Sequence, residues 1–277
     1  MPGLLSSQLL GFPADARVLL VNADDLGMHP AINDAIVSSA EAGIVRSCSV
    51  MATCPGTEHA FTLLRERPSM VCGVHLTLVR DAAADRWAPI VPGPSLVDED
   101  GLLVLHRDAA SLLARARIDE VEREFRAQLD VVLRAGVRVT HLDFHCLADG
   151  GRDDILDVAL GIAAEHGLAV RVWSDPARAR MRSAGRPVID HAFVDSFALD
   201  VAGKAEQLAA RLRALPAGLT EWAVHPGLEG AADGADHGWA VRSSDHAFLT
   251  SPAARAIVEQ EGIELIGYDV LVPAWRE

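Results

Sequence analysis

The stretch Val18–Gly27 constrains this chain more than any other. Four apolar residues, Val18–Val21, run into two adjacent carboxylates, Asp24 and Asp25, and a glycine follows them. A short apolar run is typical of a strand that is buried on both faces of a parallel sheet. Neighbouring carboxylates repel each other unless a proton or a cation lies close by. The sequence therefore predicts a buried strand that ends at a site with a positive partner.

Strand-like and helix-like segments alternate along the rest of the chain. We expect strands at 17–23, 47–51, 71–78, 137–144, 168–173, 187–193, 219–224 and 263–268. We expect helices at 30–42, 57–67, 119–135, 153–166, 204–215 and 252–262. The segments 81–106 and 230–245 are rich in Pro, Gly and Asp, and they are predicted as loops that wall a substrate cleft.

This alternation predicts an α/β fold with mostly parallel strands and outer helices. Its length of 277 residues suits a single domain over residues 1–277, with a core at about 17–268. A distorted (β/α) barrel fits the number of strands, and an open doubly wound sheet is the alternative. The first strand is not followed by GxGxxG, so a dinucleotide-binding fold loses its main support.

Composition and charge exclude several classes of partner. The net charge of −14 argues against binding to nucleic acid or to an anionic membrane surface. No apolar run reaches the roughly 20 residues of a transmembrane helix, and no secretory signal is recognisable at Met1–Leu5. The four cysteines form no CxxC pair, so we expect them to be reduced and the protein to be cytoplasmic. Assembly as a homodimer is left open.

Residues whose side chains can bind a metal ion or transfer a proton lie where four predicted strands end. They are Asp24, Asp25, His75, His141, Asp143, His145 and His225. The carboxyl ends of parallel strands meet at one face, and carboxylates with imidazoles form a usable ligand set for a divalent metal. Either His141 or His145 could bind the ion, while Asp143 could orient a ligand imidazole. The positive partner of the two aspartates is therefore predicted to be a metal ion.

Each of these residues also has a structural explanation when it is taken alone. Asp24 could cap a turn, His75 could be a hydrogen-bonded core histidine, and His225 could be a loop residue before a proline. Their convergence at one face favours function. The remaining histidines lack the pattern and are predicted as surface or structural residues: His29, His59, His106, His166, His191 and His246, with His237 left open.

Four blocks of this sequence resemble the YdjC-like (ChbG/HpnK) carbohydrate deacetylase family. The blocks are VNADDLG at 21–27, GVHLTL at 73–78, THLDFH at 140–145 and VHPG at 224–227. The resemblance runs from about Val18 to Tyr268. It implies a polysaccharide-deacetylase-like (β/α) barrel that removes N-acetyl groups from sugars with one divalent metal ion. It further implies that Asp25, His75 and His145 bind the ion, that Asp24 is the general base, and that His225 is the general acid.

The chain departs from the family pattern after Asp143. Members usually continue the second histidine block as H-x-D-S-H-H-H-x-H, whereas this chain has Phe144 in place of serine and then Cys146–Asp149. This predicts an intact metal site with altered contacts to a small carbohydrate substrate. The alternatives are a metal-dependent hydrolase of a different amide or ester, and a non-catalytic sugar-binding homologue.

Two further features of the site stay open at this level. The ligand set suits Mg²⁺ or Zn²⁺, and it also accepts Mn²⁺ or Co²⁺. Trp87 or Trp239 could stack on a sugar ring, or could simply anchor its own loop.

Overall fold

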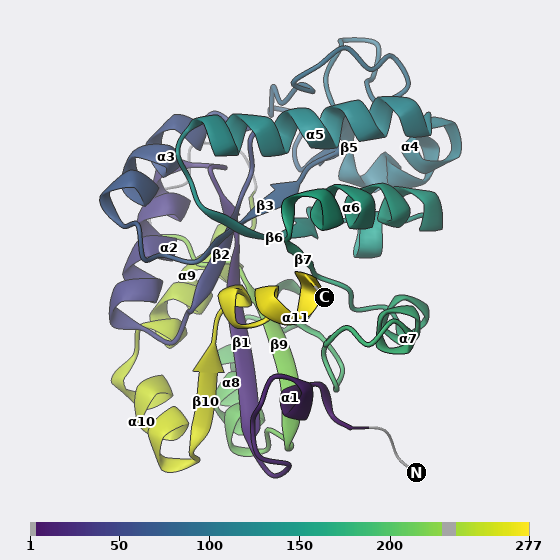
Figure 1. Ribbon diagram of the computed structural model, residues 1–277. Helices are drawn as coiled ribbons and strands as arrows, with labels where there is room; N and C mark the ends of the chain where they lie inside the picture. Colours follow the sequence, from purple (N-terminus) through teal and green to yellow (C-terminus); the bar gives the residue numbers. More distant parts are fainter. Residues whose placement is uncertain (1–3, 229–236, 277) are drawn as a thin grey trace.

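The chain folds around one parallel sheet (Figure 1). The computed structural model describes residues 4–228 and 237–276. The sheet contains β1 Arg17–Leu26, β2 Ser47–Val50, β3 Cys72–Leu76, β6 Val139–Phe144, β7 Ala169–Val170, β8 Val194–Asp195, β9 Gly218–Val224 and β10 Ile263–Ile266. Its order is β7-β6-β3-β2-β1-β9-β8, and every pair is parallel. A separate ribbon pairs β4 Val79–Arg80 with β5 Val104–Leu105.

Strand β1 is the centre of this sheet. Strand β9 pairs with it along one side, from Arg17 to Ala23. The other side is shared, because β10 pairs with Arg17–Leu20 and β2 pairs with the later part of the strand. Residues 18–26 of β1 are all buried, so both faces of the strand are covered, which explains the apolar run at 18–21.

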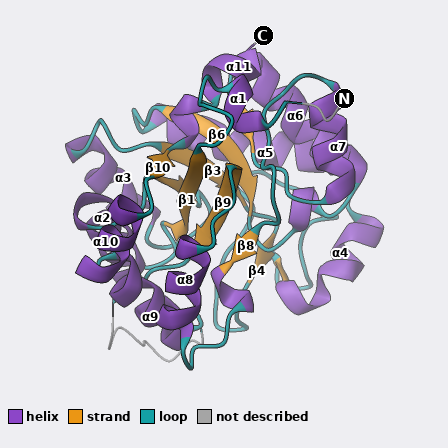
Figure 2. Cartoon of the chain, turned by 90° about the horizontal axis from the view of Figure 1, so that it is seen from below, coloured by secondary structure: helices purple, strands orange, loops and turns teal. Residues whose placement is uncertain are grey.

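Helices surround the curled strands, as the view in Figure 2 shows. They are α1 Ser6–Leu9, α2 Pro30–Ala42, α3 Thr57–Glu66, α4 Ala109–Arg115, α5 Ile118–Arg134, α6 Asp153–His166, α7 Asp175–Ser183, α8 Lys204–Arg213, α9 Trp239–Leu249, α10 Pro252–Gln260 and α11 Val272–Arg276. Among the described residues, no helix has both the length and the apolar character that crossing a membrane requires. The predicted α/β fold with parallel strands and outer helices is confirmed.

Two predicted segments differ from the structure. Residues 187–193 form no strand; the edge strand β8 follows them and is only two residues long. Asp190 explains part of this, because its carboxylate accepts the backbone N–H groups of Ser6 and Leu219 and fixes the segment by side-chain bonds. Within the predicted loop 230–245, residues 230–236 lie outside the described part, but Trp239 already begins α9.

The end of β1 breaks the even alternation of a strand. The pairing of β1 with β2 shifts its register between Ala23 and Leu26, and Asp25 has a φ of 70°. Regular alternation would send Asp24 and Asp25 to opposite faces of the sheet. A bulge with a left-handed residue redirects one of them, so both side chains reach the same pocket. Gly27 completes the turn with a φ of 100°. Only glycine fits here, because a Cβ would lie 2.7 Å from the carbonyl oxygen of Met51.

Helix α5 holds the long segment 81–106 against the sheet. The buried carboxylate of Glu124 accepts the backbone N–H groups of Ile90 and Val91, each at 3.0 Å. Gln128, one turn later, exchanges hydrogen bonds with both backbone groups of Thr77 at the end of β3. These buried bonds fix the path of the chain on either side of Asp81, and they bring that residue to the carboxyl edge of the sheet.

Candidate metal and acid–base site

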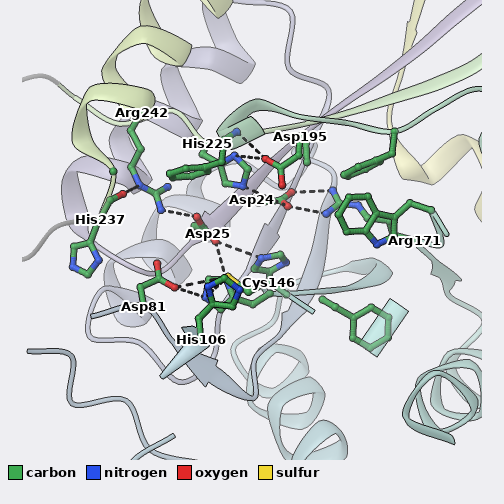
Figure 3. A pocket seen from close by; sticks show the side chains of 18 residues that line it. Asp24, Asp25, Asp81, His106, Cys146, Arg171, Asp195, His225, His237 and Arg242 are labelled. Carbon is green, nitrogen blue, oxygen red and sulfur yellow. Dashed lines mark hydrogen bonds and ion pairs between the residues drawn. The ribbon is translucent and has the colours of Figure 1, made fainter. Parts of the chain in front are cut away.

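A pocket of about 350 Å³ lies at the carboxyl ends of the central strands (Figure 3). It is lined by all five residues that the resemblance implicates: Asp24, Asp25, His75, His145 and His225. Asp24 and Asp25 lie near the end of β1 and His75 near the end of β3, while His145 and His225 directly follow β6 and β9. The expected convergence of strand ends is therefore present.

Asp25, His75 and His145 present three ligand atoms to one point. The Oδ1 atom of Asp25 lies 3.4 Å from His75 Nε2 and 3.3 Å from His145 Nδ1. This oxygen is buried, and among the described residues it accepts no well-aligned hydrogen bond. A buried carboxylate oxygen without a well-aligned hydrogen bond is costly unless a positive charge lies beside it, either on the two imidazoles or on a bound cation. The orphaned oxygen and the mixed Asp/His donor set both fit a divalent metal ion.

Each of the two imidazoles is oriented by a carboxylate on its far side. His75 Nδ1 lies 2.9 Å from Asp143 Oδ1, and His145 Nε2 lies 2.8 Å from Asp81 Oδ1. With the proton on those nitrogens, His75 Nε2 and His145 Nδ1 keep their lone pairs for the triad. Asp143 thus takes the orienting role that the sequence suggested. Asp81 was not anticipated, because it lies 64 residues from His145 in a predicted loop.

Charges around the triad favour the ligand form of Asp25 and the protonated form of the imidazoles. Burial raises the pKa of Asp25, but Arg242, His145 and His75 outweigh it and hold the pKa well below its usual value. Burial lowers the pKa of His75, but Asp143 and Asp25 outweigh it and raise the pKa to about 9. An ion that binds here must therefore displace protons from imidazole nitrogen.

Asp24 is held by an arginine that the sequence analysis did not single out. Arg171, just beyond β7, binds it in a bidentate pair at 2.7 and 2.9 Å, and Asn22 donates a third bond at 2.8 Å. Arg171 also reaches Glu221 at 2.8 Å and Asp143 at 3.1 Å. Asp24, His75 and Asp143 could offer an alternative metal set. The guanidinium of Arg171 already pairs with Asp24 and Asp143, so the set with Asp25 fits a cation better.

His225 faces Asp24 across the pocket and is fixed from behind. Its Nε2 atom lies 4.0 Å from Asp24 Oδ2, while its Nδ1 atom is 2.8 Å from the hydroxyl of Ser196. Its backbone N–H donates to Asp245 at 2.8 Å, and Asp245 in turn pairs with the buried Lys204 at 2.5 Å. The ring is therefore oriented with one nitrogen toward the pocket.

A second arginine binds the other aspartate of the pair. Arg242 on α9 donates to Asp25 Oδ2 at 2.8 Å, and in Figure 3 it reaches the pair from the side opposite Arg171. Sequence reasoning missed Arg242 because its segment was predicted as a loop. Each aspartate of the pair thus has its own guanidinium partner.

Other predicted roles change with the structure. His141 is not a ligand, because its buried ring stacks on Tyr268 with centroids 3.8 Å apart. His106, predicted as a surface or structural residue, lines the pocket, and so does His237. Trp87 is buried against His145 and His237, which supports the anchoring role. Neither Trp87 nor Trp239 is among the pocket-lining residues that the structure describes; the aromatic ones are Phe144, Trp173, Phe193 and Phe197.

Fold and pocket together define a parallel α/β protein with a carboxylate–imidazole cluster that could hold a metal ion, beside an Asp/His pair. Residues 18–260 match the sequence profile of the YdjC-like protein family, and the chain belongs to that family.

Similar proteins agree with this assignment. Carbohydrate deacetylases of Thermoanaerobacter pseudethanolicus and Geobacillus stearothermophilus are each 29% identical, covering 92% and 91% of this chain and 99% and 97% of theirs. The carbohydrate deacetylase of Brevibacillus brevis is 35% identical over 55% of this chain, a match that spans 58% of that protein. A crystal structure of an Enterococcus faecalis protein named for cellobiose-phosphate cleavage has a TM-score of 0.78 at 26% identity, covering 92% of this chain and 99% of that one.

More distant structures bear on the fold alone. A CE4-family pseudoenzyme from Bacillus anthracis has a TM-score of 0.50 at 8% identity, covering 94% of this chain and 66% of that one. The polysaccharide-deacetylase-like fold that the resemblance implied is confirmed.

Proposed function

We propose that this protein is a divalent-metal-dependent carbohydrate deacetylase that hydrolyses the N-acetyl amide of an amino sugar or oligosaccharide. The single observation that carries the proposal is the unpartnered Oδ1 of Asp25, which faces two imidazole nitrogens beside Asp24 and His225. The relatives named carbohydrate deacetylases support a carbohydrate as the substrate.

In this proposal Asp25, His75 and His145 hold one divalent ion. When bound, such an ion supplies a Lewis acid that polarises the amide carbonyl and makes water a stronger nucleophile. Asp24, fixed by Arg171, accepts the proton of the attacking water. His225 donates a proton to the amine nitrogen as the C–N bond breaks. Water thus adds to the acyl carbon, and acetate and a free amino sugar leave.

Paired substitutions of the adjacent aspartates test these roles. Asp24→Asn should lower kcat by about 10²–10⁴-fold while the ion remains bound, because it removes a proton acceptor but no metal ligand. Asp25→Asn should lose the ion as well as the activity. The measurements are acetate release from N-acetylated sugars and the metal content of the purified protein after it is refilled with Mg²⁺ or Zn²⁺. Near-wild-type turnover by Asp24→Asn would refute the assignment of the base.

The same substrate panel separates the alternative functions. Release of acetate from N-acetylated sugars supports deacetylation, whereas cleavage of other amides or esters only would make this a different metal-dependent hydrolase. Sugar binding with neither reaction would leave a non-catalytic homologue. Phe144 and Cys146 line the pocket in place of the polar residues that the family pattern has, so the panel should include acyl groups larger than acetyl.

A further inference from the structure

Beside the triad, the pocket wall carries a second set of unlike metal ligands: Asp81, His145 and Cys146. His145 Nε2 lies 2.8 Å from Asp81 Oδ1 and 3.5 Å from Cys146 Sγ, and the sulfur lies 3.9 Å from the Asp81 oxygen. Bonds of about 2.0–2.3 Å to a tetrahedral ion place its ligand atoms roughly 3–4 Å apart. These three atoms therefore already have the spacing of a tetrahedral site.

Cys146 is placed for this role by the backbone. It is the one exposed thiol of the four cysteines, since Cys48, Cys54 and Cys72 are buried. Its φ of 59° is left-handed, which is unusual for a residue with a side chain. All three ligands line the pocket, so an ion from solvent can reach them. A thiolate beside imidazole and carboxylate selects a soft ion such as Zn²⁺ or Cd²⁺ over Mg²⁺.

We infer that Asp81, His145 and Cys146 form a second metal site, which takes a thiophilic divalent ion and competes with the triad for His145. The competition rests on the proposed role of His145 as a triad ligand. A neutral imidazole has one nitrogen lone pair. While Nε2–H donates to Asp81, the lone pair of Nδ1 is open to the triad. An ion bound through Nε2 requires the proton to move to Nδ1, which closes the triad position, and the Cys146 thiol releases its proton to solvent.

The chemical consequence is that a thiophilic metal ion in the outer set would weaken binding of the inner ion by the triad. Filling the outer set would remove His145 from the inner ion without touching Asp25 or His75. The inner set contains no sulfur, so absorption from a thiolate–metal bond reports on the outer set alone. This readout does not depend on catalysis, and a failure of the proposed deacetylase activity would leave it unchanged.

The test is a Cd²⁺ titration of the metal-stripped full chain, followed by the ultraviolet charge-transfer absorption of the Cd²⁺–thiolate bond. Wild type should develop the band with one equivalent of thiolate-bound Cd²⁺. Cys146→Ser should lose it, and circular dichroism confirms that the variant is folded. Cys54→Ala is the matched control, because it removes a buried thiol close enough to His145 for their charges to interact, and it should retain the band.

His75→Ala tests the competition. It removes a triad ligand and no outer ligand, so less Cd²⁺ is drawn to the triad and the half-saturating concentration for the band should fall several-fold. A wild-type protein without the band, or a band that survives in Cys146→Ser, would overturn the second site. A half-saturating concentration that rises or stays constant in His75→Ala would overturn the competition for His145.

Discussion

Arg171 shows how much one buried side chain organises in this pocket. Its guanidinium contacts the carboxylates of Asp24, Asp143 and Glu221, and all four side chains are almost fully buried. The first of these carboxylates is the proposed base, and the second orients His75. One cation therefore links the proposed base to the carboxylate that orients a proposed metal ligand, and these contacts depend on the planar shape of the guanidinium as well as on its charge.

We expect Arg171→Lys to fold and to lose about 10²-fold in kcat with little change in KM. The ammonium keeps the positive charge but cannot make the bidentate pair, so the orientation of Asp24 is lost. Arg171→Met should instead destabilise the protein by about 3–5 kcal/mol, because three buried carboxylates lose their counter-ion. Steady-state kinetics and urea unfolding measure the two effects. Equal kcat values for Arg171→Lys and wild type would contradict the positioning role.

His141 gives a prediction about acid stability. Burial lowers its pKa to about 3, so the folded protein keeps the ring neutral while the unfolded chain protonates it near pH 6.5. A histidine with a depressed pKa stabilises the fold above its unfolded value, and that stability is lost as the pH falls from about 6.5 toward 3. The ring lies flat on Tyr268 and against Gly73, where a Cβ would come within 2.5 Å of it.

Between pH 7 and pH 5, wild type should therefore lose about 2 kcal/mol more unfolding free energy than His141→Phe. Phenylalanine keeps an aromatic ring in the stack but cannot take up a proton, so any packing cost is the same at both pH values. Urea unfolding at the two pH values gives the comparison. The same loss in both proteins would show that His141 does not set the acid limit.

At the scale of elements, a buried ion pair fastens two helices behind the proposed acid. Lys204 begins α8 and Asp245 lies in α9, and their side chains meet at 2.5 Å with almost no exposure. Asp245 also accepts the backbone N–H of His225. The packing of α8 against α9 thereby fixes where His225 stands after β9.

Lys204→Met should cost about 3–5 kcal/mol of unfolding free energy, because it leaves Asp245 buried without its cation. Adding Asp245→Asn should recover part of this loss, since the amide removes the charge and can still accept the His225 N–H. Glu206→Gln, an exposed change in the first turn of α8, is the control and should stay within about 0.5 kcal/mol of wild type. Urea denaturation of wild type, Lys204→Met, Asp245→Asn, the double variant and Glu206→Gln measures the unfolding free energies, and additive effects of the two single changes in the double variant would argue against the pair.

The elements also show what the sequence could and could not predict. Helix α2 begins at Pro30 and ends before Gly43 as predicted, because local turn chemistry sets both ends. The edge strand β8, with two residues, is too short to carry a periodic pattern. The strand ends with Asp or His predicted which residues converge in the pocket, while the choice of Asp25, His75 and His145 as the triad came from the family resemblance. Arg171 and Arg242 could not be recognised, because tertiary packing alone makes them buried partners of carboxylates.

At the scale of the whole molecule, the charge of the pocket limits the substrate. Its carboxylates are Asp24, Asp25, Asp81 and Asp195, and its arginines are Arg171 and Arg242. Both arginines are already paired with carboxylates. Within the described residues, no lysine and no further arginine lines the pocket. The four carboxylates exceed the two arginines by two negative charges, and a bound divalent ion would bring the formal charge of the pocket to about zero. A substrate without charge therefore fits best.

An unphosphorylated N-acetylated disaccharide should therefore be deacetylated with a kcat/KM at least about tenfold higher than its phosphorylated counterpart. Asp195→Asn should lower the ratio of kcat/KM for the unphosphorylated sugar to kcat/KM for the phosphorylated sugar, because it removes a negative charge from the pocket wall. Comparing ratios cancels any general effect of the change on His225, which lies 3.9 Å away. A preference for the phosphorylated sugar would mean that this charge balance does not govern selection.

The bulge at the end of β1 has a consequence for how such a protein can diversify. Asp24 and Asp25 are joined by a single peptide bond, so the spacing between the proposed proton acceptor and the proposed metal ligand is set covalently and not by the packing of separate loops. Other segments form the rest of the pocket wall, including Phe144 and Cys146. Mutations in the pocket wall can therefore change its specificity while the spacing between Asp24 and Asp25 stays the same.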